Sequence, residues 1–173
     1  MTNPPVFEGI AKARTGDNPA VVCRLPSGWV LLGETQFLAG YCVLYADPVA
    51  ESLNTISGWE RAQFLEDLSL MGDAVLAVTN ARRMNYSILG NVLPVLHGHA
   101  FPRYDWEDEA FRAGPVWLYP DATRNQPKFD PVRDAPLMKR IHDKLIELEA
   151  KVSDQTYPWQ VALGLAPKKD APN

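Results

Sequence analysis

The stretch NYSILGNVLPVLHGHAFPRY, residues 85–104, holds two of the three histidines in the chain, separated by one glycine. Its first five residues include the aromatic and β-branched side chains typical of a strand. Gly90 and Asn91 follow, a pair typical of the tight reversal of a hairpin. We therefore predict a second strand over residues 92–101, ended by Pro102, and this strand carries both histidines.

Side-chain alternation along that strand determines where the two histidines point. Residues two apart share a face at roughly 6.5 to 7 Å, so His97 and His99 line the same face as Val95. The opposite face carries small and apolar side chains, with Gly98 at its centre. The absence of a side chain at Gly98 predicts that a neighbouring element packs close to the backbone there.

The residues before this stretch predict strands followed by one long helix. Residues 1–20 are rich in Pro, Gly, Asn and Asp, which predicts an irregular N-terminal arm. Two short strands should flank a turn at Pro26–Gly28, and residues 40–47 predict a third strand. Ser57 and Glu60 fit a capping box at the start of the long helix. An apolar stripe on this helix should pack on the sheet: Phe64, Leu68, Met71, Val75 and Val78.

The residues after the stretch predict loops and a second helix. Residues 103–136 are dense in proline and aromatic residues, and the acidic run 105–109 is typical of a solvated loop. An amphipathic helix should begin near Pro136. The order of elements predicts one α+β domain over residues 21–155 with a largely antiparallel sheet, followed by a flexible tail over residues 156–173.

Composition argues against several function classes. The chain has 173 residues and a formal net charge of −4, so it lacks the basic balance that favours nonspecific nucleic-acid binding. The first residues lack the apolar core of a signal peptide, and no apolar run reaches the roughly 18 residues of a membrane span. Cys23 and Cys42 fit neither a disulfide framework nor a Cys-x-x-Cys site. We expect a cytoplasmic protein that binds neither nucleic acid nor membrane.

Three interpretations of the histidine pair stay open on its spacing alone. The imidazoles are hydrogen-bonded structural groups, metal ligands or catalytic groups. A metal site needs a further ligand, and the third histidine, His142, falls in the C-terminal helix as an expected solvated residue, so we predict no metal. A histidine whose tautomer a carbonyl fixes can attack phosphorus, and a second imidazole can donate hydrogen bonds to the phosphoryl oxygens.

The spacing N-x(5)-N-x(5)-H-x-H-x-x-P-R over residues 85–103 resembles the signature of the histidine triad (HIT) superfamily of nucleotide hydrolases and transferases. It is most similar to the bacterial branch labelled diadenosine tetraphosphate hydrolase-like. Upstream, FLAGYCVLYADPVAESLNTIS (37–57) fits the strand and proline turn before the long helix of that family. The resemblance covers residues 22–104 and implies a HIT-like α+β fold, with an antiparallel five-stranded sheet, one long helix and a C-terminal helix.

The resemblance also implies roles for individual residues. His97 takes the position of the nucleophile that forms a nucleotidyl-histidine intermediate, and His99 that of the histidine that contacts the phosphate. Asn91 stands where the family has a polar residue near the phosphate or leaving group, and Asn85 where it has an asparagine on the substrate-facing strand. Glu34 stands near an acidic residue that binds ribose hydroxyls in several members.

By the same resemblance, the protein is a metal-independent enzyme that needs no cofactor. It would cleave dinucleoside polyphosphates or nucleoside phosphoramidates at the α-phosphate. The implied partners are a purine nucleotide and a second copy of the chain, because family members typically dimerise by joining two five-stranded sheets.

Two departures from the family pattern predict slower turnover. Val95 stands where the first histidine of the triad is expected, although the backbone carbonyl of residue 95 remains available to orient His97. Tyr41 replaces a histidine that many members carry after the equivalent of Gly40. Tyrosine can donate a hydrogen bond there but protonates a leaving group less readily near neutral pH. The alternative function is therefore a catalytically weakened nucleotide-binding or sensing protein.

Overall fold

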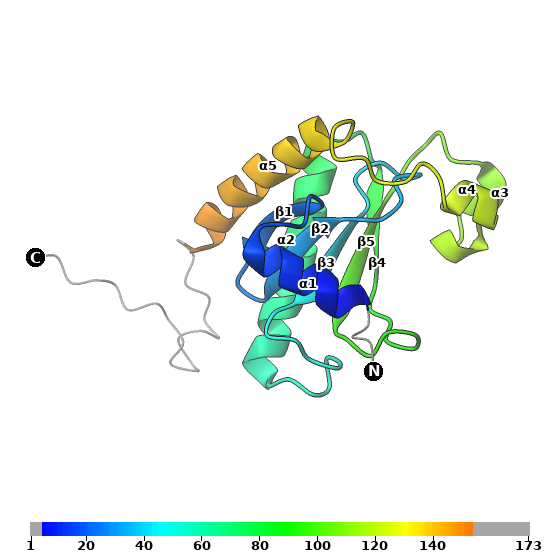
Figure 1. Ribbon diagram of the computed structural model, residues 1–173. Helices are drawn as coiled ribbons and strands as arrows, with labels where there is room; N and C mark the ends of the chain where they lie inside the picture. Colours follow the sequence, from blue (N-terminus) through cyan, green and yellow to red (C-terminus); the bar gives the residue numbers. More distant parts are fainter. Residues whose placement is uncertain (1–4, 154–173) are drawn as a thin grey trace, which may run out of the picture.

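Five strands form one antiparallel sheet in the order β1-β2-β3-β5-β4, with helices on both of its faces (Figure 1). The structure is a computed structural model, and it describes residues 5–153. The strands are β1 Val21–Leu25, β2 Gly28–Leu32, β3 Cys42–Ala46, β4 Arg83–Ser87 and β5 His97–Arg103. The predicted α+β fold with five antiparallel strands is confirmed.

Three longer helices and three short ones accompany the sheet within the described residues. They are α1 Pro5–Thr15, α2 Gly58–Val78, α3 Glu109–Arg112, the 3-10 helix η1 Val116–Leu118, α4 Asp121–Arg124 and α5 Ala135–Ser153. Helix α2 packs on one face of the sheet and α5 packs against α2 and β1. Helix α1 lies on the other face, and α3 and α4 lie beyond the β4 and β5 side (Figure 1).

Helix α2 begins where the sequence predicts. The Ser57 hydroxyl accepts from the N–H of Glu60, and the Glu60 carboxylate accepts from the N–H of Ser57, which completes the capping box. The predicted apolar stripe lies in the core between α2 and the sheet: Phe64, Leu68, Met71, Val75 and Val78. Helix α5 closes this core with Ile141 and Leu145, both fully buried.

Gly98 allows a close contact between α2 and the sheet. A Cβ atom at this position would lie 2.8 Å from both terminal methyl carbons of Leu68. A side chain at this position would require the Leu68 side chain to move. The predicted close approach at Gly98 is confirmed. The histidines lie on the opposite face of β5.

The N-terminal segment is not the irregular arm predicted from its composition. Residues Pro5–Thr15 form helix α1, and Ile10 and Ala13 are buried. Arg14 forms an ion pair with Asp47 at the end of the β3 strand. Tertiary burial of one helix face therefore outweighs the local signal of the prolines and glycines.

The predicted tight turn at Gly90-Asn91 is wrong. Residues 88–96 form a loop, and β5 begins only at His97. The N–H of Leu96 donates to the carbonyl of Ala50 at 2.7 Å, so this part of the backbone bonds to the loop after β3 and not to β4. The strand predicted over residues 92–101 is thus shifted toward the C-terminus, and Pro102 lies within it.

The C-terminal helix is confirmed near its predicted start at Pro136. The flexible tail predicted over residues 156–173 lies outside the described residues. Within residues 5–153, no helix combines the length and apolar character needed to cross a bilayer. Cys23 and Cys42 are both buried and form no disulfide.

Candidate functional site

Strand β5 carries His97 and His99 on the face of the sheet opposite α2. Their ring centroids lie 4.8 Å apart, and the rings meet edge to face. His99 is flanked by Val43 of β3 and Ser87 of β4, its partners in the two neighbouring ladders. The structure therefore brings the two histidines together in the interior of the sheet, as strand alternation predicts.

His97 is held by the backbone two residues before it. Its Nδ1 atom lies 2.6 Å from the carbonyl oxygen of Val95, and its ring stacks on Tyr45 with centroids 5.5 Å apart. A carbonyl can only accept, so Nδ1 carries a proton, and in the neutral imidazole Nε2 then keeps its lone pair. The Val95 side chain is fully buried against Ile10 of α1, which fixes the orienting carbonyl.

His99 forms the complementary hydrogen bond. Its Nδ1 lies 2.7 Å from the Tyr41 hydroxyl. Burial, with a smaller contribution from His97, lowers the pKa of His99 to about 4, so this imidazole is neutral at pH 7. Burial also raises the pKa of the Tyr41 phenol, which stays protonated. Its hydroxyl hydrogen has no other acceptor within residues 5–153, so we assign Tyr41 as donor and place the proton of His99 on Nε2.

Tyr41 is positioned by the loop between β2 and β3. The N–H of Gly33 donates to the carbonyl of Tyr41 at 2.7 Å. The buried side chain of Gln36 donates to the same carbonyl at 3.1 Å and accepts from the N–H of Gly40 at 2.9 Å. A Cβ at Gly33 would lie 2.2 Å from the Tyr41 ring, so glycine makes room for it. No sequence signal pointed to Gln36.

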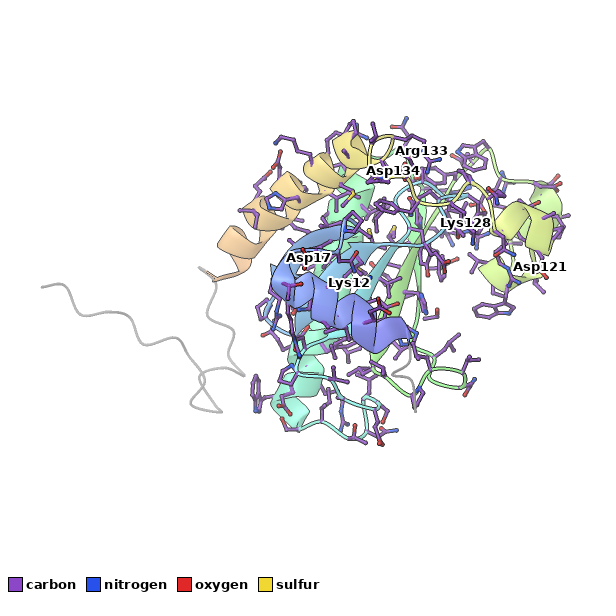
Figure 2. The ribbon with its side chains drawn as sticks, viewed as in Figure 1. Lys12, Asp17, Asp121, Lys128, Arg133 and Asp134 are labelled. Atoms are coloured by element: carbon purple, nitrogen blue, oxygen red, sulfur yellow. The ribbon has the colours of Figure 1, made fainter. Side chains whose placement is uncertain are left out.

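Two hollows on this face flank the histidines. One, of about 360 Å³, has Leu31 and Val43 in its floor and is lined by Glu34 and Lys128. We call it the β2–β3 hollow. The Glu34 side chain is 89% exposed and lies 3.7 Å from the ammonium of Lys128. Lys128 lies on the segment between α4 and α5 (Figure 2). Lys128 is distant in sequence from every predicted site residue, and the sequence analysis missed it.

The other hollow, of about 400 Å³, lies between β4, the neighbouring Phe101 of β5, and residues 113–117. We call it the β4 hollow. Its lining includes Asn85, Ser87 and the half-exposed Trp117. The Ser87 hydroxyl is closed off from solvent and has no hydrogen-bond partner within the described residues. Neither Ser87 nor Trp117 was a predicted site residue.

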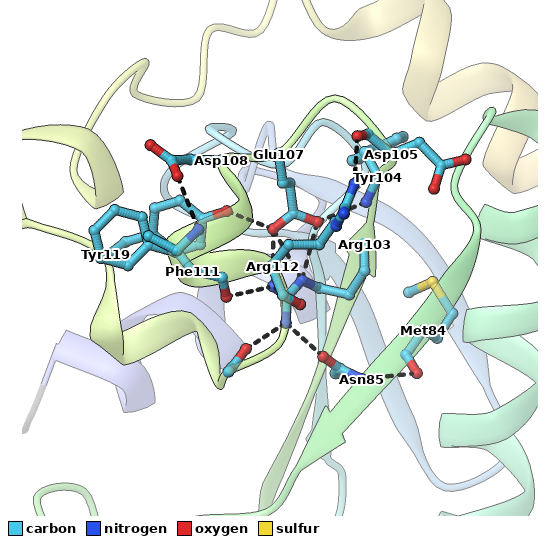
Figure 3. Close-up of polar contacts among 12 residues, drawn as sticks. Met84, Asn85, Arg103, Tyr104, Asp105, Glu107, Asp108, Phe111, Arg112 and Tyr119 are labelled. Carbon is cyan, nitrogen blue, oxygen red and sulfur yellow. Dashed lines mark hydrogen bonds and ion pairs between the residues drawn. The ribbon is translucent and has the colours of Figure 1, made fainter.

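Asn85 belongs to a buried network at the end of β4 and β5 (Figure 3). Its Oδ1 accepts from Arg103 at 2.7 Å. The Arg103 guanidinium also donates to Glu107 at 2.9 to 3.0 Å, and the Tyr119 hydroxyl donates to the same carboxylate at 2.6 Å. Glu107 is buried, so the predicted solvated loop over residues 105–109 is wrong at this position. Its carboxylate is compensated by hydrogen bonds inside the protein.

The structure does not bring the remaining predicted residue to the histidines. Asn91 is exposed in the loop 88–96, and no hydrogen bond within residues 5–153 joins it to His97 or His99. Among the described residues, no group of three His, Cys, Asp or Glu side chains is arranged to hold a metal ion. His142 is exposed on α5 beside Asp143.

Solved structures share this fold over most of the chain. A histidine triad protein from Bradyrhizobium japonicum has 20% identity and a TM-score of 0.64, with 84% of this chain and 97% of that one covered. A hypothetical histidine triad nucleotide-binding protein from Sulfolobus tokodaii has 13% identity and a TM-score of 0.65, covering 87% and 99%. A zinc-bound histidine triad family protein from Mycobacterium smegmatis has 16% identity and a TM-score of 0.60, covering 84% and 96%.

These similarities define the class of fold: the chain has the fold of histidine triad proteins. No protein-family model matches the sequence, and no curated protein matches it at a significant level. At 13% to 20% identity, the similarity to these structures is a similarity of fold.

Proposed function

We propose that this protein is a HIT-type nucleotide hydrolase or transferase that cleaves nucleotide conjugates at the α-phosphorus. Its substrates would be dinucleoside polyphosphates or nucleoside phosphoramidates, as in the diadenosine tetraphosphate hydrolase-like branch. The observation that carries the proposal is the pair of hydrogen bonds at the two Nδ1 atoms, one between His97 and the Val95 carbonyl and one between His99 and the Tyr41 hydroxyl. From these bonds we assign a lone pair to Nε2 of His97 and an N–H to Nε2 of His99. The centroids of the two rings lie 4.8 Å apart.

In the first step, Nε2 of His97 attacks the α-phosphorus and the bond to the leaving group breaks, with its electron pair leaving on the bridging atom. The Val95 carbonyl stabilises the positive imidazolium through the proton on Nδ1. The Nε2–H of His99 donates to a phosphoryl oxygen. Water then attacks the phosphorus of nucleotidyl-His97, and the N–P bond breaks with its electron pair returning to Nε2. One proton of the water stays on the released nucleotide and the other passes to solvent, so the neutral imidazole returns.

The purine nucleotide is proposed to lie in the β2–β3 hollow. Its floor is apolar, as a nucleoside requires, and Glu34 and Lys128 at its rim offer a carboxylate for ribose hydroxyls and a cation. No cofactor or metal enters the proposed reaction. Asn85 supports the site through Arg103, and we assign no contact with substrate to Asn91 because it is exposed in a separate loop.

The test is incubation of the pure protein with diadenosine tetraphosphate and with adenosine 5′-phosphoramidate. We expect release of AMP by the wild type and loss of release by roughly a thousandfold or more in His97→Ala, since the nucleophile is absent. Quenching during turnover with an alkaline denaturant should trap an acid-labile, base-stable adenylyl group on the wild type only. His142→Ala, which removes the exposed histidine of α5, should match the wild type.

The alternative is a nucleotide-binding or sensing protein that has lost catalysis. Val95 in place of the first triad histidine and Tyr41 in place of a further histidine favour it. If calorimetry shows nucleotide binding and cleavage does not exceed the level of His97→Ala, the protein is a nucleotide-binding or sensing protein and the proposed hydrolase is wrong. The absence of both binding and cleavage would contradict both functions.

We further infer that two copies of the chain join along β4. This strand pairs only with β5 in the described sheet, so it is an edge strand to which a further strand can add. Leu65 and Leu89 are exposed beside it. Sedimentation should give a dimer mass, and Leu89→Lys should shift it toward monomer. A monomeric wild type at micromolar concentration would contradict this. A cytoplasmic location remains a prediction.

A further inference from the structure

We propose that the cavity between the first turns of α2 and the loop 47–56 binds an organic ammonium ion with a short apolar or aromatic body. We call it the α2 cavity. Its volume is about 480 Å³, which exceeds that of either hollow beside the histidines and is typical of small-molecule sites. Neither His97 nor His99 lines it, so this site is separate from the proposed nucleotide site.

The α2 cavity lies on the face of the sheet opposite the histidines. Its floor is made by Phe64 of α2 and Leu96, two almost fully buried side chains of the core between α2 and the sheet. The loop 47–56 lies below the first turns of α2 in Figure 1 and closes the cavity from that side. Leu96 donates to the carbonyl of Ala50 at 2.7 Å and accepts from the N–H of Ala46 at 3.0 Å. These backbone hydrogen bonds hold the loop in place, so the cavity is formed before any ligand binds.

Trp59 supplies an aromatic wall for the α2 cavity. Its side chain is 53% exposed on the first turn of α2, and Ile56 lines the cavity beside it. An apolar body between Trp59 and the floor would remove apolar surface from water on both sides. The face of an indole ring also attracts a cation, which favours a ligand that combines an apolar body with a positive charge.

The polar side chains of the lining favour a ligand that donates hydrogen bonds. Ser27 and Gln63 both donate to the buried carboxylate of Asp67. The Thr55 hydroxyl donates to the carbonyl of Ser52 at 2.9 Å. Ser27, Thr55 and Gln63 thus each use a donor within the protein. The lining therefore offers a ligand mainly acceptors.

The charges of the lining favour a cation. The charged side chains that line the α2 cavity are Asp47, Glu51 and Glu60, all of them acidic. Two arginines compensate Asp47, but neither Glu51 nor Glu60 forms an ion pair within residues 5–153. Hydrogen bonds from Ser57 lower the pKa of Glu60, so its carboxylate is ionised at pH 7. An ammonium group has three donors and no acceptor and matches this lining, whereas a phosphate would be repelled.

Three ligands of matched shape test the proposed class. Phenethylamine, phenethyl alcohol and hydrocinnamate each carry one phenyl ring on a short chain, and at pH 7 they are positive, neutral and negative. The measurement is NMR of the indole N–H signals of the full chain, with the Trp59 signal assigned from its loss in Trp59→Phe. We expect phenethylamine to shift this signal with a Kd of about 1 mM or tighter, and hydrocinnamate to bind at least about tenfold more weakly.

Two variants and their matched controls test the lining by ligand-detected NMR. Glu51→Gln should weaken phenethylamine by about threefold to fivefold, the effect of one exposed carboxylate, and should reduce its preference over hydrocinnamate. Trp59→Ala should weaken phenethylamine by about fivefold or more. Glu66→Gln and Trp106→Ala remove exposed side chains of the same types outside the cavity, and both should keep the wild-type Kd. Melting temperatures of all four variants check that they are folded.

Titration with AMP separates the α2 cavity from the proposed nucleotide site. Saturating AMP should leave the Kd of phenethylamine unchanged and should not shift the Trp59 signal. Competition between the two ligands, or binding of phenethylamine without a shift at Trp59, would overturn the α2 cavity as the site. Equal affinity for the three ligands would overturn the ammonium class. A protein that neither binds nor cleaves nucleotides would contradict the proposed hydrolase, but selective binding of phenethylamine at Trp59 would still support the α2 cavity.

Discussion

The carbonyl oxygen of Val95 lies 2.6 Å from Nδ1 of His97, so the backbone of residue 95 orients the proposed nucleophile. The orienting group is part of the backbone and does not depend on which side chain residue 95 carries. The isopropyl group of Val95 is buried and packs against Ile10 and Leu93. Packing and orientation at this position can therefore be separated by mutation.

Substituting Val95→Ala should destabilise the protein without removing the nucleophile. Loss of two buried methyl groups should lower the free energy of unfolding by about 1 to 3 kcal/mol. The carbonyl remains, so kcat should fall by less than about threefold. Urea unfolding and steady-state kinetics on the same preparation check both values. A loss of kcat comparable with that of His97→Ala, in a folded variant, would show that the side chain is needed for orientation.

Tyr41→Phe should impair activity and spare stability. The ring would keep its stacking on Phe101, where centroids lie 4.4 Å apart, but Nδ1 of His99 would lose its donor. His99 could then place its proton on Nδ1 and present a bare Nε2 to the phosphoryl oxygen. We expect kcat/KM to fall by roughly tenfold, the effect of one charge-directed hydrogen bond.

Tyr86→Phe is the matched control for Tyr41→Phe. The Tyr86 ring borders the β4 hollow, but its hydroxyl lies near Gly72 of α2, on the face of the sheet opposite His99, so loss of the hydroxyl should leave kcat/KM unchanged. Equal activity of the two variants would contradict the assigned donor role of Tyr41.

His99 should make the protein less stable as the pH falls from about 6.5 to about 4. Its folded-state pKa of about 4 lies below the ordinary value of 6.5, because burial disfavours the imidazolium. The unfolded chain therefore binds more protons in this window, and the free energy of unfolding decreases with acidification by up to about 3 kcal/mol. Above the window this contribution is fully present.

The measurement is urea unfolding at several pH values between 4 and 7.5. His99→Phe should have a flatter dependence than the wild type, because the group that titrates only in the unfolded chain is gone. His142→Gln removes an exposed histidine and should keep the steeper dependence. If His99→Phe and the wild type show the same slope, the buried, neutral state assigned to His99 is wrong.

The parts of the fold that local pattern determines were predictable. The capping box at Ser57, the stripe of α2 and the placement of both histidines on one face follow from spacing alone. Gly98 was informative for the same reason, because a missing side chain in a strand implies close packing.

The parts that depend on distant contacts were not predictable. Helix α1 forms because Ile10 is buried against the sheet, which its local prolines and glycines do not reveal. Glu107 is an acidic residue within an acidic run, and only the folded chain places it against Arg103. Lys128 reaches the β2–β3 hollow on a segment that lacks a periodic pattern, so nothing local marked it.

Glu107→Ala should be among the most destabilising single changes in the chain. The side chains of Arg103 and Glu107 are 5% and 0% exposed, and removing the carboxylate leaves a buried guanidinium without its counter-charge. Breaking one partner of a buried pair typically lowers the free energy of unfolding by about 3 to 5 kcal/mol. Asp105→Ala, which breaks the exposed pair with Arg82, should lower it by less than about 1 kcal/mol. Urea unfolding of the two variants gives the comparison.

The same change tests whether this network supports the β4 hollow. Glu107 accepts from Tyr119, and Arg103 donates to the carbonyl of Gly114, so the pair ties down both ends of the segment that carries Trp117. In Glu107→Ala, backbone amides of residues 113–118 should exchange faster with deuterium, while Asp105→Ala should leave their exchange unchanged. Unchanged exchange in this segment would mean that the sheet edge alone positions Trp117, and that the buried pair serves stability only.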